Sequence, residues 1–518
     1  MLAKTYASTV QGVEATTITV EVNAGGKPLE GRPYFQLVGL PDNAVREGFS
    51  RIESAIKNCH LDFPRIMLVV NLAPADIKKE GSAFDLPIAI GFLAATGTLV
   101  CNDLEEYLIM GELSLDGALR PIKGALPIAI QARKEKFKGL ILPKQNAKEA
   151  AIVNDINVYG IENLRDVVDF LNGEIHIEPE EHNTREIFEA NVQSYDVDFS
   201  DVKGQQNIKR ALEIAAAGGH NVILIGPPGA GKTMLAQRLP SILPPLSLQE
   251  ALETTKIHSV AGMLGHNTSL IATRPFRSPH HTISDVALVG GGSNPSPGEI
   301  SMAHNGVLFL DELPEFKRQV LEVMRQPMEA RKVTISRAKV SVDYPASFML
   351  IASMNPCPCG FYNHPEKECV CGPGQVKKYL SKVSGPLLDR IDLHVEVTPV
   401  SYDELAQREF VSETSSEIVK RVIRARDIQT ERFKGQEGVY CNAQMSGRMV
   451  IEVCKINQAG SVLLKTAMEK LQLSARAYDR ILKVARTAAD LSGSEDIKIE
   501  HLAEAIQYRS LDREGWAG

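Results

Sequence analysis

The sequence predicts a multidomain α/β protein, and three regional patterns indicate this fold class. Residues 1–172 mix the alternation of strands with the spacing of helices, as α+β domains do. Between residues 198 and 400, short apolar segments end in glycine-rich or acidic turns, which is typical of a parallel α/β core. Residues 401–518 repeat their apolar positions at helical spacing and are expected to form a helical domain, with helices over Ser415–Arg432 and Ala475–Leu491, the second capped by Ser474. The acidic residues 173–197 are expected to be a linker.

The composition excludes several classes of protein. The chain has 518 residues, enough for about three domains, and its 44% hydrophobic and 23% charged content is ordinary for a globular protein. A net charge of −7 argues against coating of nucleic acid by the whole surface, so a nucleic-acid site has to be a local basic patch. Met1–Val10 lacks the apolar segment of a signal peptide, and the apolar run Leu86–Cys101 is too short to span a bilayer. We therefore expect a cytoplasmic protein with no membrane partner and with reduced cysteines, unless these bind metal.

The N-terminal domain begins with elements of both kinds. Thr17–Val22 alternates like a strand, and Phe35–Gly39 and Ile66–Leu72 are further predicted strands. Between them, Asn43–Asn58 carries apolar residues at helical spacing. This domain has no phosphate-binding motif, so we expect it to serve in assembly or in contact with a substrate or a protein partner.

The strongest local signal is Gly226–Thr233, GPPGAGKT, which matches the pattern G-x-x-x-x-G-K-[ST] of a phosphate-binding loop. A buried strand, Asn221–Ile225, is expected before it, and a helix is expected after it until Pro240. This arrangement directs backbone N–H groups and a helix dipole at an anion. Lys232 is expected to reach the terminal phosphates and Thr233 to ligate Mg²⁺. The glycines that let the backbone wrap round the phosphates are Gly226, Gly229 and Gly231.

A second acidic site follows the apolar strand Gly306–Leu310, which ends in Asp311 and Glu312. Asp311 is expected to hold the water shell of Mg²⁺, and Glu312 to polarise the water that attacks the terminal phosphate. Two acids at the end of a strand are common by themselves. Together with the upstream loop they predict a nucleoside triphosphate hydrolase, with ATP and Mg²⁺ as its cofactors.

Between these motifs lies Arg274–Ser284, RPFRSPHHTIS, and then the glycine- and proline-rich segment Gly290–Gly298. This composition forbids a long regular element and predicts an insertion loop. The adjacent His280 and His281 are candidates for metal ligands, although neighbouring histidines more often make polar contacts in a loop.

A local basic patch follows the acidic site. Residues 317–339 contain seven Lys and Arg against two Glu, a balance of +5. Lys332–Val342 alternates like a β-hairpin, with Arg337 and Lys339 near its turn. These cations would bind the phosphates of DNA without reading its sequence. The alternative is a solvated hairpin.

Four cysteines are clustered within residues 357–371. Cysteines two residues apart on an extended chain face the same side, so each pair presents two thiolates. Two pairs supply the four ligands of a structural Zn²⁺ site, although the spacing departs from C-x-x-C and His364 is an alternative ligand. Free thiols and disulfides are the other possibilities. The residues are Cys357, Cys359, Cys369 and Cys371.

Arg274–Ser284 and Asn305–Phe316 resemble the ComM/YifB family of magnesium-chelatase-like AAA+ ATPases, and the resemblance covers essentially the whole chain. It implies a Lon/ribosomal-S5-like N-terminal domain, an AAA+ P-loop core and a helical lid. It also implies a homo-hexameric ring whose hydrolysis of ATP moves branched or single-stranded DNA. The implied activity is branch migration of recombination intermediates, in natural transformation where the host is competent.

The resemblance also implies roles for single residues of the core. Asn355, after the apolar strand Phe348–Met354, matches the first sensor, which positions the lytic water. Arg390 falls at the arginine finger, which reaches the γ-phosphate bound by a neighbouring subunit. A salt bridge from Arg390 to Asp389 or Asp392 is the alternative.

Two further basic residues are assigned in the same way. Leu473–Arg476 resembles the second sensor, whose arginine, here Arg476, contacts the γ-phosphate. Arg480 lies one helical turn away on the same face and is the alternative. Arg337 falls where related helicases carry a pore lysine that contacts DNA.

The N-terminal domain resembles Lon-type peptidases in two segments. Ungapped matching places Ala83 at the nucleophilic serine and Leu126 at the basic lysine. Neither side chain can attack a carbonyl or take a proton, so peptidase activity is expected to be absent. A shift of one residue, which would promote Ser82 and Lys123, is the alternative. The two segments are Lys79–Pro87 and Arg120–Leu126.

Two other functions fit the same motifs. One is the ATPase subunit of a magnesium chelatase, which drives Mg²⁺ into a porphyrin through a protein partner. The other is a nucleotide-switched assembly platform with slow turnover. The Lon-like domain argues against the first, and the complete set of hydrolytic residues argues against the second.

Overall fold

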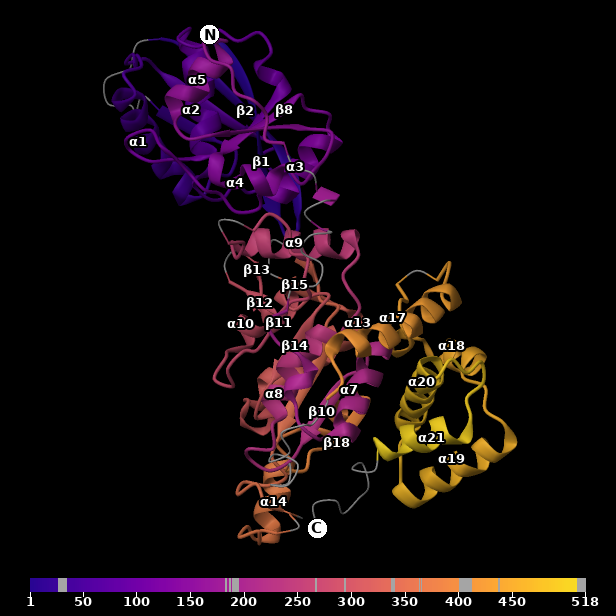
Figure 1. Cartoon of the computed structure of the whole chain (residues 1–518). Coiled ribbons are helices and arrows are strands. Elements are labelled where there is room, and N and C mark those ends of the chain that lie inside the picture. Colours follow the sequence, from indigo (N-terminus) through magenta and orange to yellow (C-terminus); the bar gives the residue numbers. More distant parts are fainter. Residues whose placement is uncertain are drawn as a thin grey trace. The chain divides into compact units, whose positions relative to one another are not determined.

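The computed structural model divides into two compact units. Figure 1 colours the chain by sequence, from indigo at the N-terminus to yellow at the C-terminus. Unit 1 comprises Met1–Asn191 and Leu248–Ile271, and unit 2 comprises Val192–Ser247 and Ala272–Gly518. The structure describes the whole chain except residues 27–34, 182–183, 186–187, 189–194, 266–267, 293–294, 337–340, 363, 365, 400–411, 437 and 510–518.

Unit 1 is built on a mixed seven-stranded sheet with the order β3-β4-β2-β1-β5-β8-β9. β1 and β2 form a long antiparallel hairpin, and β5, β8 and β9 are parallel neighbours. The three strands expected from the sequence are β2, β3 and β4. The bounds are β1 (Leu2–Gln11), β2 (Glu14–Ala24), β3 (Phe35–Val38), β4 (Leu68–Ala73), β5 (Tyr107–Ile109), β8 (Gly139–Pro143) and β9 (Asn157–Ile161), with a separate pair β6 (Glu112–Leu113) and β7 (Leu119–Arg120).

The helices of unit 1 cover this sheet. α1 has the expected bounds, Asn43–Asn58, because the Asp42 carboxylate caps it by accepting from the Val45 N–H at 2.9 Å. α2 is apolar on all sides and is buried from Asp85 to Ala95. The bounds of the helices after α1 are α2 (Asp85–Thr96), α3 (Ala125–Lys134), α4 (Lys144–Ala150), α5 (Leu164–Leu171) and α9 (Leu248–Ala261). Single 3-10 turns are η1 (Ser82–Phe84) and η2 (Leu104–Glu106).

Helix α9 belongs to unit 1 although its sequence lies between the phosphate loop and the acidic strand. The Ser259 hydroxyl donates to the buried carboxylate of Glu149 on α4. The backbone N–H of Gly124, just before α3, donates to the Ser259 carbonyl at 3.2 Å. Glu149 also accepts from the Leu126 N–H at 2.9 Å, so one carboxylate joins α3, α4 and α9.

Unit 2 contains a parallel five-stranded sheet with the order β11-β14-β17-β10-β18, which confirms the predicted parallel α/β core. Because all strands are parallel, their carboxyl ends meet at one edge, where ligands bind in such sheets. Every residue of β10, β14 and β17 is buried. The bounds are β10 (Val222–Ile225), β11 (Phe276–Arg277), β14 (Val307–Leu310), β17 (Met349–Met354) and β18 (Leu393–Glu396).

Short elements surround this sheet. α7 ends at Gly218 because Gly219 takes a left-handed φ of 70°. The insertion has only short pieces, as expected, and the basic segment forms the predicted hairpin, β15–β16. The bounds are η3 (Phe199–Asp201), α7 (Gln206–Gly218), α8 (Lys232–Arg238), η4 (Leu239–Ile242), α10 (Asp285–Val289), β12 (Gly290–Gly291), β13 (Ser296–Pro297), α11 (Glu299–Met302), η5 (Leu313–Glu315), α12 (Arg318–Val323), α13 (Arg325–Ala330), β15 (Lys332–Ser336), β16 (Ser341–Pro345), α14 (Pro373–Leu380) and α15 (Gly385–Leu388).

The C-terminal part of unit 2 is helical. Thr414 and Ser474 cap α17 and α20, which have the bounds expected from the sequence. Buried residues such as Val422 and Ile481 share one core with the sheet. None of the described helices is long and apolar enough to cross a membrane. The bounds are α17 (Ser415–Arg432), η6 (Asn442–Gln444), α18 (Gly447–Val453), α19 (Gln458–Leu471), α20 (Ala475–Leu491) and α21 (Ile499–Gln507).

Candidate functional site

The phosphate-loop motif connects β10 to α8, as the sequence predicts. Gly229 and Gly231 have φ values of 79° and 83°, a left-handed region that L side chains rarely adopt. A Cβ on Gly226 would lie 2.2 Å from the backbone oxygen of Val397, so only glycine fits at the end of this strand. The glycines therefore determine the conformation of the loop, and α8 begins directly after it, at Lys232.

Lys232 is the first residue of α8, and its side chain turns back over the loop. Its Nζ donates to the carbonyl oxygens of Gly226 and Pro227, at 2.7 and 2.9 Å, and to Oδ1 of Asn355 at 3.1 Å. Burial lowers the pKa of the Lys232 ammonium, and Asp311 opposes that shift. The structure thus brings together a loop lysine and an amide that the sequence placed 123 residues apart.

The acidic pair lies at the carboxyl end of β14, beside the loop. The Thr233 hydroxyl donates to Oδ2 of Asp311 at 2.8 Å. A hydroxyl and a carboxylate in contact form the kind of oxygen donor set that Mg²⁺ takes when it also binds phosphates. Glu312 has a left-handed φ of 54°, which is uncommon for a residue with a side chain and recurs at functional sites.

Two residues that the sequence reasoning missed hold this arrangement in place. The Ser353 hydroxyl, on β17, donates to Oδ1 of Asp311, which also accepts the Glu312 N–H at 3.0 Å. Gln205 donates from Nε2 to the carbonyl oxygens of Ala230, at 2.9 Å, and Thr398, at 3.2 Å, and so ties the loop to the end of β18. Ser353 is the polar residue two positions before Asn355, and that alternation was the available signal.

The predicted finger, Arg390, is buried within its own chain. Its guanidinium forms a 2.6 Å ion pair with Glu329 and donates to the Pro386 carbonyl at 2.6 Å. Neither Asp389 nor Asp392, the partners that the sequence suggested, is its ion-pair partner among the described contacts.

The two candidates for the second sensor differ in exposure. The Arg476 side chain is 64% exposed and lies 3.7 Å from Asp389. Arg480 is bound to the buried carboxylate of Asp392. Neither arginine contacts Lys232, Thr233 or Glu312 among the described interactions. The roles of Arg390 and Arg476 thus remain predictions that depend on a second subunit or on bound nucleotide.

The four clustered cysteines converge as the sequence predicts. Their sulfur atoms all lie within 4.8 Å of one another, with three separations of 3.3, 3.5 and 3.7 Å. Thiolates around a tetrahedral Zn²⁺, at Zn–S distances of about 2.3 Å, lie roughly 3.8 Å apart, so the cluster fits this ion. His364 is outside the cluster, because its Nδ1 accepts the N–H groups of Glu366 and Lys367. The four side chains that could together hold a metal ion are therefore Cys357, Cys359, Cys369 and Cys371.

The basic hairpin is present, and its register pairs Ser336 with Ser341. Arg337 and Lys339, the predicted DNA-binding residues, lie outside the described residues. At the base of the hairpin, Lys332 forms a 2.7 Å ion pair with Asp343, so this cation is neutralised within the protein.

The peptidase-like positions of unit 1 do not form a serine–lysine pair. The Ser82 hydroxyl donates to the carboxylate of Glu112. Lys123 is exposed, and its aliphatic stem covers Gly262, where a Cβ would lie 2.8 Å from Cε of Lys123. Leu126 is completely buried. The absence of this proteolytic chemistry from unit 1 stays a prediction.

Comparison with known protein families matches most of the chain to magnesium chelatase. The family described as magnesium chelatase, subunit ChlI, matches residues 198–405. Subunit ChlI of Mg-chelatase matches residues 20–146, and the ChlI C-terminal family matches residues 412–509. The first and last of these lie in unit 2, apart from the stretch Leu248–Ile271.

Two of the similar proteins match nearly the whole chain, and a third matches a part of it. Competence protein ComM of Haemophilus influenzae is 45% identical over 514 residues, which are 99% of this chain and 98% of that protein. The uncharacterized protein YifB of Escherichia coli is 43% identical over 97% of this chain and 96% of its own length. Lon protease 2 of Bacillus subtilis is 31% identical over 157 residues, which are 28% of this chain and 27% of that protease.

Proposed function

Because the chain belongs to the ComM/YifB family of magnesium-chelatase-like ATPases, we propose that it is an ATP-hydrolysing ring motor that acts on DNA. Its proposed activity is branch migration of recombination intermediates. The observation that carries the proposal is the assembled hydrolytic site, in which Lys232, Thr233 and Asp311 meet at the carboxyl edge of the parallel sheet. A binding platform without turnover would not need the adjacent, strained Glu312.

Each residue of this site has a defined task in the proposed hydrolysis. The loop N–H groups and the Lys232 ammonium would bind the β- and γ-phosphates. Thr233 and Asp311 would hold Mg²⁺, which neutralises charge on those phosphates. Glu312 would accept a proton from the attacking water, and Asn355 would orient that water.

A ring of subunits would complete the site. Arg390 of a neighbouring subunit would stabilise the charge that develops on the γ-phosphate, and Arg476 would contact the same phosphate from the helical part. Arg390 would first have to leave Glu329, with which it is paired within one chain. Ring assembly would therefore leave the Glu329 carboxylate without this cation, because Arg390 would move to the γ-phosphate of the neighbouring subunit.

DNA is the proposed substrate because residues 317–339, which include the first strand of the hairpin, carry a balance of +5 in a chain whose net charge is −7. Arg337 and Lys339 at the hairpin turn would contact the DNA backbone. The similarity to Competence protein ComM supports a role in natural transformation where the host is competent, with the motor working in the cytoplasm. Unit 1, which has no phosphate loop, would bind a protein partner or assist assembly.

A second candidate is an ATPase subunit that drives a protein partner, as in magnesium chelatase. The matches to chelatase subunit ChlI favour it, because they span both units. In that case a large protein partner rather than DNA would stimulate hydrolysis.

The deciding experiment follows ATP-dependent movement of a labelled four-way DNA junction, with Glu312→Gln as the blank. We expect the wild type to resolve the junction and the variant to bind it without movement. Hydrolysis of ATP by the wild type with no movement of any branched DNA would reject the DNA motor and favour the chelatase-like alternative.

A further inference from the structure

The catalytic carboxylate has a neighbour that the reaction scheme above does not use. Nδ1 of His281 lies 3.8 Å from Oε2 of Glu312. This separation is within ion-pair range but longer than a hydrogen bond. Catalytic contacts are often this loose before substrate binds and tighten afterwards. A small movement would therefore bring the His281 imidazole within hydrogen-bonding distance of the Glu312 carboxylate.

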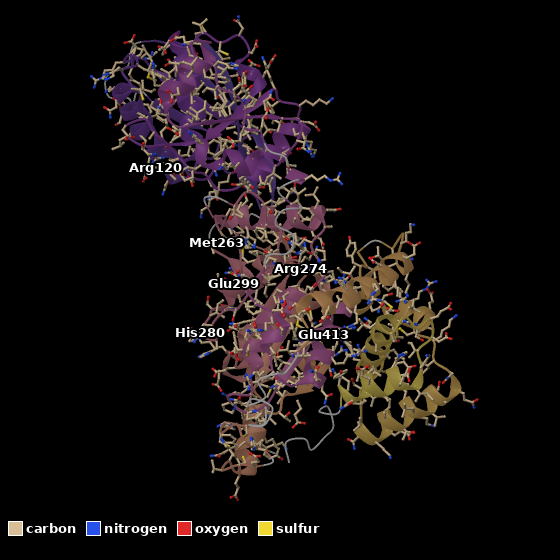
Figure 2. All side chains as sticks on the ribbon, in the orientation of Figure 1. Arg120, Met263, Arg274, His280, Glu299 and Glu413 are labelled. Atoms are coloured by element: carbon tan, nitrogen blue, oxygen red, sulfur yellow. The ribbon has the colours of Figure 1, made fainter. Side chains whose placement is uncertain are left out.

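Strand pairing explains why these two residues meet. β11 runs parallel to β14, with Phe276 opposite Val307 and Arg277 opposite Leu308. Glu312 follows the carboxyl end of β14, and the segment that carries His280 and His281 follows the same end of β11 (Figure 2 labels His280). A bidentate ion pair from Arg277 to Glu299, at 2.6 and 2.7 Å, anchors the end of β11.

The His281 ring is held from two sides. It lies tilted against the His280 ring, with centroids 4.1 Å apart, and it makes a T-shaped contact with the Phe316 ring, with centroids 6.4 Å apart. Phe316 is buried, so it provides a fixed wall. His280 itself contacts Thr282, through Nδ1 at 2.9 Å, and has no described contact with Glu312. His281 thus lies near the Glu312 carboxylate, and His280 packs against His281.

The insertion that carries His281 also contacts the hairpin. Gly290 packs so closely on β15 that a Cβ would lie 2.9 Å from Cδ1 of Ile335. The buried Tyr344 of β16 donates its hydroxyl to the Pro295 carbonyl at 2.6 Å. The insertion thus contacts the β15–β16 hairpin at Gly290 and Pro295, and it lies near the Glu312 carboxylate at His281.

We propose that His281 is a positioning residue for Glu312 and that the insertion relays the state of the β15–β16 hairpin to it. A displaced hairpin shifts Gly290 and Pro295, and with them the segment whose other end carries His281. The position of the Glu312 carboxylate, and so the rate of water attack, then depends on what the hairpin has bound. The positioning role rests on the proposed ATPase reaction, and the relay rests in addition on the proposed DNA contact.

The test measures steady-state ATP hydrolysis, with and without a four-way DNA junction. His281→Ala should lower kcat without DNA by about tenfold or more, because a misplaced base loses rate, while KM for ATP stays unchanged. His281→Asn should recover part of this loss, since the asparagine amide nitrogen can occupy the place of Nδ1. His176→Ala, at an exposed histidine of unit 1 that lies 3.0 Å from Glu178, is the matched control and should change kcat by less than about twofold.

A double-variant cycle shows whether His281 acts through Glu312. In a Glu312→Gln background, His281→Ala should cause no further loss of the residual rate. A wild-type kcat for His281→Ala, a raised KM with an unchanged kcat, or an additive loss in the double variant would each overturn the positioning role.

The relay has its own readout. Tyr344→Phe removes the hydroxyl that holds Pro295, and it should reduce the ratio of the DNA-stimulated to the basal rate; full stimulation of this variant would overturn the relay. If DNA does not stimulate even the wild type, the DNA motor and the relay both fail. The effect of His281→Ala without DNA still decides the positioning role in that case.

Discussion

Asp392 is a buried anion with two cationic or polar partners. Arg480 binds it from α20, and Nδ1 of His220 lies 3.2 Å away. Complete burial opposes ionisation, but Arg480 and His220 still hold the pKa of Asp392 well below its usual range. Arg480 is thus held by a buried carboxylate, while Arg476, one turn away, stays exposed.

Asp392→Asn should therefore destabilise unit 2 by about 3 to 5 kcal/mol, because it leaves the Arg480 charge buried without a partner. The free energy of unfolding is measured by urea titration at neutral pH. Asp389→Asn is the matched control on the more exposed carboxylate and should cost less than about 1 kcal/mol.

The same carboxylate predicts a pH dependence. A lowered folded-state pKa stabilises the fold above the unfolded value of about 4, and this contribution is lost as the pH falls further. Wild type should thus lose more stability than Asp392→Asn when the pH falls from about 5 to about 3. Equal losses in the two proteins would contradict an ionised Asp392.

At the site itself, Lys232 and Glu312 separate nucleotide binding from chemistry. Lys232→Ala should weaken ATP binding by more than about tenfold, because a charge-assisted contact to phosphate is lost. Glu312→Gln should keep ATP affinity and lower hydrolysis by about a hundredfold or more, since only the proton acceptor is removed. Fluorescent-nucleotide titration and phosphate release distinguish the two; wild-type hydrolysis by Glu312→Gln would refute its assignment.

At the scale of single elements, the stability of the cysteine cluster is expected to depend on a bound metal ion. The described residues of 357–371 form no helix or strand, so a Zn²⁺ held by four thiolates would supply the stability that regular structure does not. We expect about one Zn²⁺ per chain in purified protein and its loss in Cys359→Ser, measured by elemental analysis. Cys101→Ser, a lone cysteine of unit 1, is the control and should retain the metal; wild-type protein purified without zinc would contradict the site.

The β15–β16 hairpin is an element whose tip and base differ in charge. At the base, Lys332 is paired with Asp343. Replacing Arg337 and Lys339 by Ala should weaken DNA binding and reduce the slope of log affinity against log salt by about 1.5, since two phosphate contacts disappear. Lys332→Ala should leave that slope unchanged; an unaltered slope in the tip variant would indicate a merely solvated hairpin.

At the scale of the whole molecule, the chain crosses between the two units three times, after residues 191, 247 and 271. The crossing segment carries α9, which the buried Glu149 holds to α3 and α4 of unit 1. Burial raises the pKa of the Glu149 carboxyl, and the Ser259 hydroxyl bond opposes the shift. Leu248–Ile271, which lies between the two ATPase motifs in the sequence, thus belongs physically to unit 1.

Ring assembly makes a prediction about mixed subunits. If Arg390 acts on the neighbouring subunit, Lys232→Ala and Arg390→Ala chains are each inactive but complementary. In an equal mixture, about half of the sites have an intact loop, from the Arg390→Ala chain. About half of those face an intact finger, from the Lys232→Ala chain. Random mixing should therefore restore about a quarter of the wild-type ATPase rate. No recovery on mixing, in rings confirmed by light scattering, would place Arg390 in its own subunit's structure.

The sequence by itself determined the parallel core, the bounds of α1, α17 and α20, and the residues of the phosphate loop and acidic strand. It could do so because local periodicity, capping residues and a contiguous motif encode them. The family resemblance added roles for Asn355, Arg390 and Arg476, of which the structure brings Asn355 to Lys232.

Only the tertiary structure decided which distant residues meet. Ser353 reaches Asp311 because β17 pairs with β14, and His281 reaches Glu312 because β11 lies on the other side of that strand. Packing likewise decided which of the two candidate arginines is exposed: Arg480 pairs with buried Asp392, and Arg476 does not. These contacts depend on strand order and burial, and neither is a property of any short stretch of sequence.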